Sequence, residues 1–287
     1  MSLTLEKLVI QSLDDVKDKS GKIIITKSDI MHCLMDAIGK DKSYIIANHD
    51  VKIKNNQLIK FNFMLDSLKQ GTPLAYVLGN QLFYNYKYYV NHDVLIPRPE
   101  TEIIISEIIS RGDNIFNSRE KFNVIDAGSG SGCIGLSINS ERNQWNIILI
   151  EKSVAATKIL NKNYHLESRN NCHIVMGDWL SAFDENTANI IVSNPPYIEP
   201  ESAEIDKSVI DYEPMMALFS KDQGLSDIRR IIVESRKVLK KDGLLFIENG
   251  FDQSDKVVEI LKEHYYEDID IILDYNNIKR FTISRSP

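Results

Sequence analysis

The sequence predicts an α/β protein: a mostly parallel, doubly wound sheet with an antiparallel hairpin at its C-terminal edge, preceded by a small helical bundle. From residue 122 onward, β-branched apolar runs alternate with segments of helical periodicity, which is typical of parallel sheets with right-handed crossovers. Only residues 275–279 separate the last two apolar runs, and so short a connection requires antiparallel pairing. In the first seventy residues, apolar positions such as Leu5, Leu8 and Val9 recur at helical spacing.

The N-terminal part is expected to form four helices, at residues 3–16, 27–38, 42–46 and 58–69. Ser28-Asp29 and Ser43 precede apolar residues and are the expected helix caps. These helices predict one domain, residues 1–72. Its residues carry no chemical motif, so packing against the rest of the chain is one open interpretation of its role.

Residues 73–98 are expected to connect the two domains through a β-hairpin, because residues 83–90 are rich in tyrosine and phenylalanine. Few basic residues lie among these aromatic rings, which favours packing over nucleic-acid stacking. The Pro97-Arg98-Pro99 turn predicts an extended approach to a helix that starts near Glu100. Arg98 and Glu100 either form a local ion pair or line a pocket.

Residues 99–287 are expected to form the catalytic domain around the parallel sheet. Its predicted parallel strands are residues 122–127, 145–151, 172–177, 188–193 and 243–249, its helices residues 132–141, 153–168, 225–240 and 253–264, and its hairpin strands residues 269–274 and 280–284. Asn276-Asn277 is expected to make the hairpin turn, because asparagine tolerates the left-handed conformation. The segment 199–223 is long for an α/β connection and predicts a substrate-binding rim.

A glycine-rich turn, Asp126–Gly132, follows the first predicted strand and precedes a helix. Its glycines allow positive φ and close approach to a ligand, and the helix N-terminus presents free N–H groups there. The turn is not the dinucleotide fingerprint, because Cys133 occupies its third glycine position. The next strands end in Glu151, an acceptor for ribose hydroxyls, and in Asp178-Trp179, an acceptor beside a flat ring suited to adenine.

The tetrapeptide Asn194-Pro195-Pro196-Tyr197 ends another predicted strand, because two prolines cannot continue a central ladder. It leaves an asparagine amide, a backbone carbonyl and an aromatic ring at a strand's carboxyl end, where ligands bind in open α/β sheets. Two carbonyl acceptors beside a ring suit a planar group that carries an NH2.

Together these strand ends resemble S-adenosylmethionine-dependent methyltransferases that act on a planar nitrogen through an Asn-Pro-Pro-Tyr site. The runs 73–83, 95–102 and 213–218 narrow the resemblance to the HemK/PrmC family. That family methylates the side-chain amide of the glutamine in the Gly-Gly-Gln motif of peptide chain release factors. The resemblance therefore implies S-adenosyl-L-methionine as cofactor, S-adenosyl-L-homocysteine as product, a release factor as partner, and a substrate-engaging role for residues 1–72.

The resemblance also implies residue roles. Catalysis is assigned to Asn194, Pro195 and Tyr197, and acceptor binding to Asn194, Pro195, Pro196 and Tyr197. Cofactor binding is assigned to Gly128, Ser129, Gly130, Ser131, Gly132, Glu151, Asp178, Trp179 and Asn194. By resemblance, Arg98 and Glu100 are also expected in the pocket.

Composition argues against several other classes of protein. A formal net charge of −7 argues against a broad duplex-binding face, and no apolar run reaches the ~20 residues of a membrane helix. The three cysteines are isolated, which favours a reducing compartment and no metal. The first residues lack a signal-peptide pattern, so we expect a cytoplasmic protein. The six histidines are scattered and lie in no motif.

Two other functions stay open at this point. The first is an amino-group methyltransferase acting on DNA adenine, RNA or a ribosomal protein; a DNA enzyme would need base flipping and a basic recognition surface. The second is a release-factor-binding protein that keeps the fold without turnover.

Overall fold

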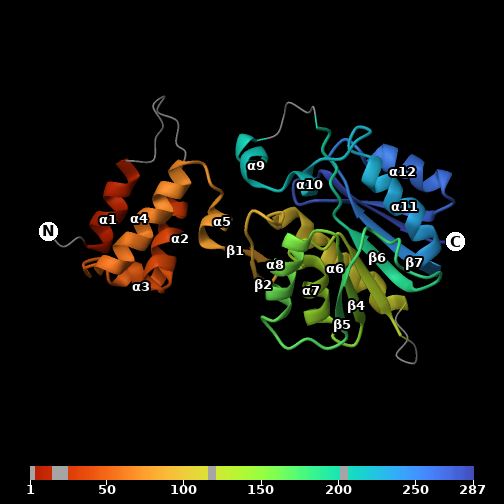
Figure 1. Cartoon of the computed structure of the whole chain (residues 1–287), viewed down its shortest axis with the longest axis horizontal. Helices are drawn as coiled ribbons and strands as arrows, with labels where there is room; N and C mark the ends of the chain where they lie inside the picture. Colours follow the sequence, from red (N-terminus) through yellow and green to blue (C-terminus); the bar gives the residue numbers. More distant parts are fainter. Residues whose placement is uncertain (1–3, 15–24, 116–120, 201–205) are drawn as a thin grey trace. The chain divides into compact units, whose positions relative to one another are not determined.

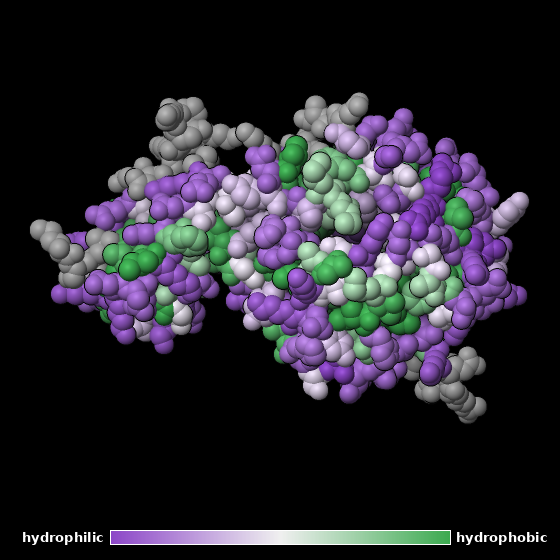
Figure 2. All heavy atoms as spheres, in the orientation of Figure 1, coloured by the Kyte–Doolittle hydropathy of each residue, from purple (hydrophilic) through white to green (hydrophobic). Residues whose placement is uncertain are grey.

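The computed structural model describes residues 4–14, 25–115, 121–200 and 206–287, and the chain divides into two compact units, Met1–Gly79 and Asn80–Pro287. Figure 1 shows the helices of the first unit and the sheet of the second. Hydrophilic residues cover most of the face drawn in Figure 2, and hydrophobic residues appear there in separate patches. Among the described residues, no helix is long and apolar enough to span a membrane.

The first unit is helical, as predicted. Its helices are α1 (Leu5–Asp14), α2 (Lys27–Ile38), α3 (Lys42–Ala47), α4 (Asn55–Lys69) and α5 (Leu74–Leu78). The apolar stripes of α1, α2 and α4 form its core, in which Ile30, Leu34 and Phe61 are fully buried. Of the first predicted helix, residues 3, 15 and 16 lie outside the described residues.

The predicted caps of α2 and α3 were wrong by two residues. The α2 N-cap is Thr26, whose hydroxyl accepts from the Asp29 N–H while Asp29 accepts from the Thr26 N–H, so the two residues form a capping box. The α3 N-cap is Asp41, whose carboxylate accepts from the Tyr44 N–H at 2.7 Å. Ser28 and Ser43 already lie inside the first helical turn, where they cannot cap it.

The second unit begins with the predicted hairpin, β1 (Asn80–Phe83) paired antiparallel with β2 (Tyr86–Tyr89). Phe83 and Tyr88 are buried in a core cluster, and the Tyr88 hydroxyl lies 2.7 Å from the Ser137 hydroxyl. The aromatic run therefore packs, as its sequence favours. The helix expected near Glu100 starts as a 3-10 turn, η1 (Pro99–Glu102), and continues as α6 (Ile103–Ile115).

The central sheet has seven strands in the order β5-β4-β3-β6-β7-β9-β8. The parallel strands are β3 (Asn123–Ala127), β4 (Asn146–Glu151), β5 (Cys172–Met176), β6 (Ala188–Ser193) and β7 (Leu239–Glu248). The strand β9 (Lys279–Arg285) runs antiparallel to both β7 and the edge strand β8 (Glu267–Leu273). The predicted fold class is confirmed, although β7 starts earlier than expected.

Helices cover both faces of this sheet (Figure 1). One core cluster includes residues of α6, α7 (Cys133–Glu141) and α8 (Val154–Tyr164), and the other includes residues of α11 (Ser226–Val238) and α12 (Ser254–Glu263). The strand order reverses between β3 and β6, because β4 and β5 lie on one side of this pair and β7 on the other. Ligands of doubly wound sheets bind at such a switch point.

One of two connections singled out in the sequence differs from its prediction, and the other is confirmed. The described part of the long segment 199–223 contains two short helices, α9 (Lys207–Tyr212) and α10 (Met215–Leu218), instead of one structureless loop; residues 201–205 lie outside the description. The hairpin turn is made by Asn277 at φ 60°, as the asparagine pair predicted. The Asp274 carboxylate accepts from the Asn276 and Ile278 N–H groups and holds that turn.

Candidate active site

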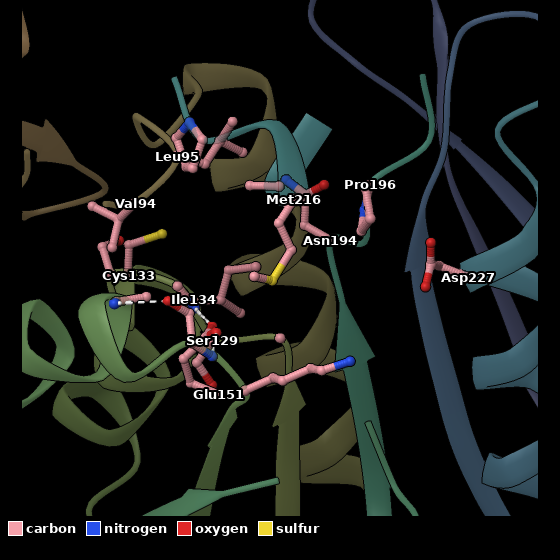
Figure 3. A pocket seen from close by; sticks show the side chains of 18 of the residues that line it. Val94, Leu95, Ser129, Cys133, Ile134, Glu151, Asn194, Pro196, Met216 and Asp227 are labelled. Carbon is pink, nitrogen blue, oxygen red and sulfur yellow. Dashed lines mark hydrogen bonds between the residues drawn. The ribbon is translucent and has the colours of Figure 1, made fainter. Parts of the chain in front are cut away.

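A cavity of about 280 Å³ lies at the carboxyl ends of the parallel strands. Figure 3 shows Ser129 and Glu151 on one side of it and Asn194 and Pro196 on the other, with Met216 extending between them. Many of the predicted site residues line it: Gly128, Ser129, Gly130, Ser131, Glu151, Asp178, Trp179, Asn194, Pro196 and Arg98. The sheet topology thus brings together side chains that are far apart in the sequence.

The glycine turn is shaped by close packing. Gly128 has φ 78°, and a Cβ there would lie 2.7 Å from the Trp179 ring. The Gly128 and Ser129 N–H groups both donate to the Ile150 carbonyl, which fixes the turn beside β4. Gly132 is the N-cap of α7 at φ 83°; it faces Leu160 and Leu136, and it is not among the cavity-lining residues.

Asp126, at the base of this turn, has a role that the sequence did not reveal. Its carboxylate accepts from the Gly135 N–H at 2.9 Å, and thereby ties β3 to the first turn of α7. Gly135 has no room for a side chain, since a Cβ would lie 2.2 Å from Leu149. Burial, reinforced by the nearby Glu151 charge, raises the pKa of Asp126 to about 7.

Glu151 holds the turn from the other side. One carboxylate oxygen accepts from the Gly130 N–H at 2.8 Å, and the other accepts from the Ser153 N–H at 2.7 Å. A carboxylate has about four lone-pair sites, so both oxygens keep capacity for further donors. The predicted ribose contact is therefore compatible with these backbone hydrogen bonds.

Asp178 and Trp179 close the end of the cavity next to β5. Although partial burial opposes its ionisation, Arg230 at 3.1 Å and Lys152 at 3.2 Å lower the pKa of Asp178. The Trp179 indole N–H donates to Asp227 at 3.2 Å, which holds the ring against Gly128. Ion pairs already engage the Asp178 side chain, and the sequence did not predict them.

The tetrapeptide follows β6 and contributes unequally to the cavity. Asn194 and Pro196 line it, and Pro195 is buried but lines neither this cavity nor its neighbour. The Asn194 amide NH2 lies 3.4 Å from the Thr101 hydroxyl, and the Tyr197 hydroxyl donates to Glu248 at 3.3 Å. Burial, followed by the nearby Glu248 charge, raises the pKa of Tyr197, so its hydroxyl stays protonated.

A second cavity, of about 580 Å³, adjoins the first. It shares Leu95, Arg98, Asn194 and Ala217 with the first cavity. Tyr197, Phe251, Lys256 and Arg280 also line it. Asn194 therefore lines two adjoining spaces, and a transfer between two ligands requires a residue that both can reach.

Arg98 lines both cavities, but its ion-pair partner is Glu213 at 2.6 Å and not Glu100. Glu213 also accepts from the Ile96 N–H at 3.1 Å, and its side chain is 1% exposed. Glu100 lines neither cavity. Among the described residues, no group of three or more His, Cys, Asp or Glu side chains is placed to hold a metal ion.

Sequence reasoning missed Thr101, Glu213 and Glu248, which hold these elements together. A signal existed for Glu248, because it ends an apolar strand just as Glu151 does. Glu213 begins the run 213–218, which supported the family resemblance but assigned no role to this residue. Thr101 carried no signal beyond its place in the Pro-Arg-Pro-Glu-Thr run.

Comparison with known proteins gives consistent matches. The methyltransferase small domain family matches residues 112–212, and the PrmC N-terminal domain family matches residues 21–79. A release factor glutamine methyltransferase of Francisella tularensis is 36% identical over 259 residues, covering 90% of each chain. The protein of the same name from Escherichia coli is 30% identical over 247 residues, covering 86% of this chain and 87% of its own.

Solved structures share the fold. The N-terminal domain of human METTL16, determined in complex with SAH, matches with a TM-score of 0.51 and 16% identity, covering 90% of this chain and 94% of its own. A methyltransferase from Pyrococcus furiosus matches with a TM-score of 0.51 and 14% identity, covering 69% of this chain and 88% of its own.

Proposed function

The chain belongs to the release factor glutamine methyltransferase family, and from this membership we propose its reaction. It transfers a methyl group from S-adenosyl-L-methionine to the side-chain amide nitrogen of the glutamine in the Gly-Gly-Gln motif of peptide chain release factors. The observation that carries this proposal is the meeting of the glycine turn, Glu151, Trp179 and Asn194 in one cavity.

The residues of the first cavity fit the cofactor. The turn has space at Gly130, where a Cβ would meet no atom within 4 Å, so a ligand can approach its backbone. Glu151 would accept from ribose hydroxyls, and Trp179 would lie against the adenine. When bound there, S-adenosyl-L-methionine supplies an electrophilic methyl group on a sulfonium.

The residues around Asn194 would promote the transfer by orienting the acceptor amide toward the methyl group. An amide nitrogen is a poor nucleophile, because its lone pair is delocalised into the carbonyl. The Asn194 side-chain oxygen would accept one N–H of the acceptor amide and favour positive charge on its nitrogen. The Pro195 carbonyl would accept the other N–H only if the tetrapeptide shifts when the acceptor binds, because Pro195 lines neither cavity. Tyr197 would hold the amide plane, and after transfer the methylated nitrogen would lose one proton to solvent while S-adenosyl-L-homocysteine leaves. Positioning of this kind can supply roughly 7–11 kcal/mol of a barrier.

The second cavity is the proposed site of the acceptor glutamine, because Asn194 and Tyr197 both line it, whereas Tyr197 does not line the first cavity. The described part of the segment 199–223 would form its rim through Glu199, Val209, Leu218 and Gln223. We further propose that the N-terminal helices engage the release factor, and that the reaction takes place in the cytoplasm without metal, membrane or nucleic acid.

The test is an incubation with labelled S-adenosylmethionine and a purified release factor, with its Gly-Gly-Gln→Gly-Gly-Ala variant and duplex DNA in parallel. We expect label on the wild-type factor alone. Label on DNA would replace the proposal with a base methyltransferase. Cofactor binding without label on any substrate would favour a binding protein without turnover.

A further inference from the structure

We propose that Glu248 and Thr101 are positioning residues that fix the orientation of the Asn194 amide and the Tyr197 hydroxyl for the acceptor. The inference rests on the proposed function, in which Asn194 and Tyr197 bind the acceptor amide and Glu248 and Thr101 have no part. Both groups are buried, and their contacts join η1, β7 and the segment after β6.

The sheet places Glu248 beside Asn194. Strands β6 and β7 are parallel neighbours, and Ser193 pairs with Ile247 at their ends. Asn194, the first residue after β6, therefore lies beside Glu248, the last residue of β7. The turn η1 brings Thr101 to the same point, and both Thr101 and Glu248 are 2% exposed.

Three hydrogen bonds connect these groups. The Thr101 hydroxyl donates to Glu248 Oε2 at 2.6 Å, and the Tyr197 hydroxyl donates to Glu248 Oε1 at 3.3 Å. The Asn194 Nδ2 group donates to Thr101 Oγ1 at 3.4 Å. One carboxylate thus holds, directly or through one hydroxyl, the two side chains that we assign to acceptor binding.

The direction of these bonds determines which end of the Asn194 amide is available. An ionised Glu248 can only accept, and Thr101 has a single proton, which it gives to Glu248. Thr101 can then only accept from Asn194, so the group facing it must be the NH2. The Asn194 oxygen is thereby left for an N–H of the acceptor amide, as the proposed chemistry requires.

The protonation state of Glu248 determines the direction of the hydrogen bonds through Thr101 to Asn194. Burial raises the pKa of Glu248 to about 7; Thr101, Arg280 and Tyr197 oppose the rise, and Glu100 adds to it. When pH falls through this value, Glu248 gains a proton and can donate to Thr101. The Thr101 proton is then free to face Asn194, and the reversed amide becomes acceptable. Turnover is therefore expected to fall on the acid side of about pH 7.

Two isosteric variants and one matched control test the proposal. Thr101→Val removes the hydroxyl, and Glu248→Gln can donate to Thr101 at every pH. The control is Thr282→Val, because Thr282 is equally buried and loses one hydrogen bond, to Asn249 at 2.9 Å, without touching Asn194. Thermal unfolding measures the loss of stability in each variant.

We expect kcat to fall about tenfold in Thr101→Val and Glu248→Gln, equivalent to one lost orienting hydrogen bond. The cofactor dissociation constant should stay unchanged in Glu248→Gln, because Glu248 lines neither cavity. Thr282→Val should keep the kcat of the wild-type protein. The acid fall in kcat should flatten in Glu248→Gln. Equal kcat in all three variants, or an unchanged acid limb, would overturn the proposal.

A second measurement does not depend on turnover. Hydrogen exchange of the Asn194 side-chain NH2, assigned by its loss in Asn194→Asp, should be slower in the wild-type protein than in Thr101→Val. Equal exchange would reject the positioning contact. If the wild-type protein methylates no release factor, the proposed function fails, and this exchange experiment alone still decides the positioning role.

Discussion

At the scale of single residues, the glycine turn depends on the absence of a side chain at Gly128. Gly128 combines a left-handed backbone with a Trp179 ring that would lie 2.7 Å from any Cβ. Gly128→Ala should therefore displace the ring and raise the cofactor dissociation constant about tenfold or more. Isothermal titration with S-adenosylmethionine measures this change.

The matched control is Gly39→Ala in the helical unit. Gly39 has φ 66°, close to that of Gly128, but a Cβ there would meet no atom within 4 Å. It should cost about 1 kcal/mol of stability through backbone strain and leave cofactor affinity unchanged. Equal losses of affinity in both variants would mean that strain, and not the ring contact, matters.

The raised pKa of the buried Asp126 makes the stability of the fold depend on pH. Folding raises the pKa of Asp126 to about 7, so the folded protein favours the neutral carboxyl group. The stabilisation that this neutral group contributes is fully present below the pKa of Asp126 in the unfolded chain, which is near 4. That contribution is lost as pH rises toward and through 7. Asp126→Asn keeps an acceptor for the Gly135 N–H but cannot ionise. The unfolding temperature of the wild-type protein should therefore fall relative to that of the variant between pH 4 and 8, and parallel curves would refute the assignment.

At the scale of elements, one ion pair ties the loop 95–98 to the segment that carries α9 and α10. Glu213→Gln keeps an acceptor for the Ile96 N–H but loses the charge that pairs with Arg98. Because both cavities share Arg98, we expect the KM for the release factor and the cofactor dissociation constant each to rise several-fold, by about 1 kcal/mol.

Asp113→Asn is the control for that variant, since it weakens the pair of Arg142 and Asp113, whose 2.7 Å contact lies outside both cavities. Steady-state kinetics with varied release factor should leave its KM at the wild-type value. A rise in KM of the same size in both variants would show that surface charge alone explains the effect.

The elements also show how far a sequence can be interpreted. Apolar runs marked the strands, and the residue that ends or follows each run lies at the carboxyl edge of the sheet, so the place of Glu151 and Asn194 in the cavity was predictable. The bond from Thr101 to Glu248 joins residues 147 positions apart, and that from Ile96 to Glu213 joins residues 117 apart. Local patterns carry no information on such pairings, and for the same reason the partner of Arg98 was not predictable.

At the scale of the whole molecule, the two units divide the proposed work. All residues that line the two cavities lie between Asp93 and Arg280, within the unit Asn80–Pro287. A chain of residues 80–287 should therefore bind S-adenosylmethionine as the full chain does, while its kcat/KM for the release factor falls about tenfold or more. Circular dichroism verifies its folding, and undiminished kcat/KM would reject the substrate-engaging role of the helical unit.

The most direct test of the central claim is Asn194→Ala, measured for cofactor binding and for methyl transfer to the release factor in the same preparation. We predict that S-adenosylmethionine still binds, because the glycine turn, Glu151 and Trp179 remain, while most of the transfer activity is lost. Turnover close to that of the wild-type protein would contradict the assignment of Asn194 as the residue that orients the acceptor amide.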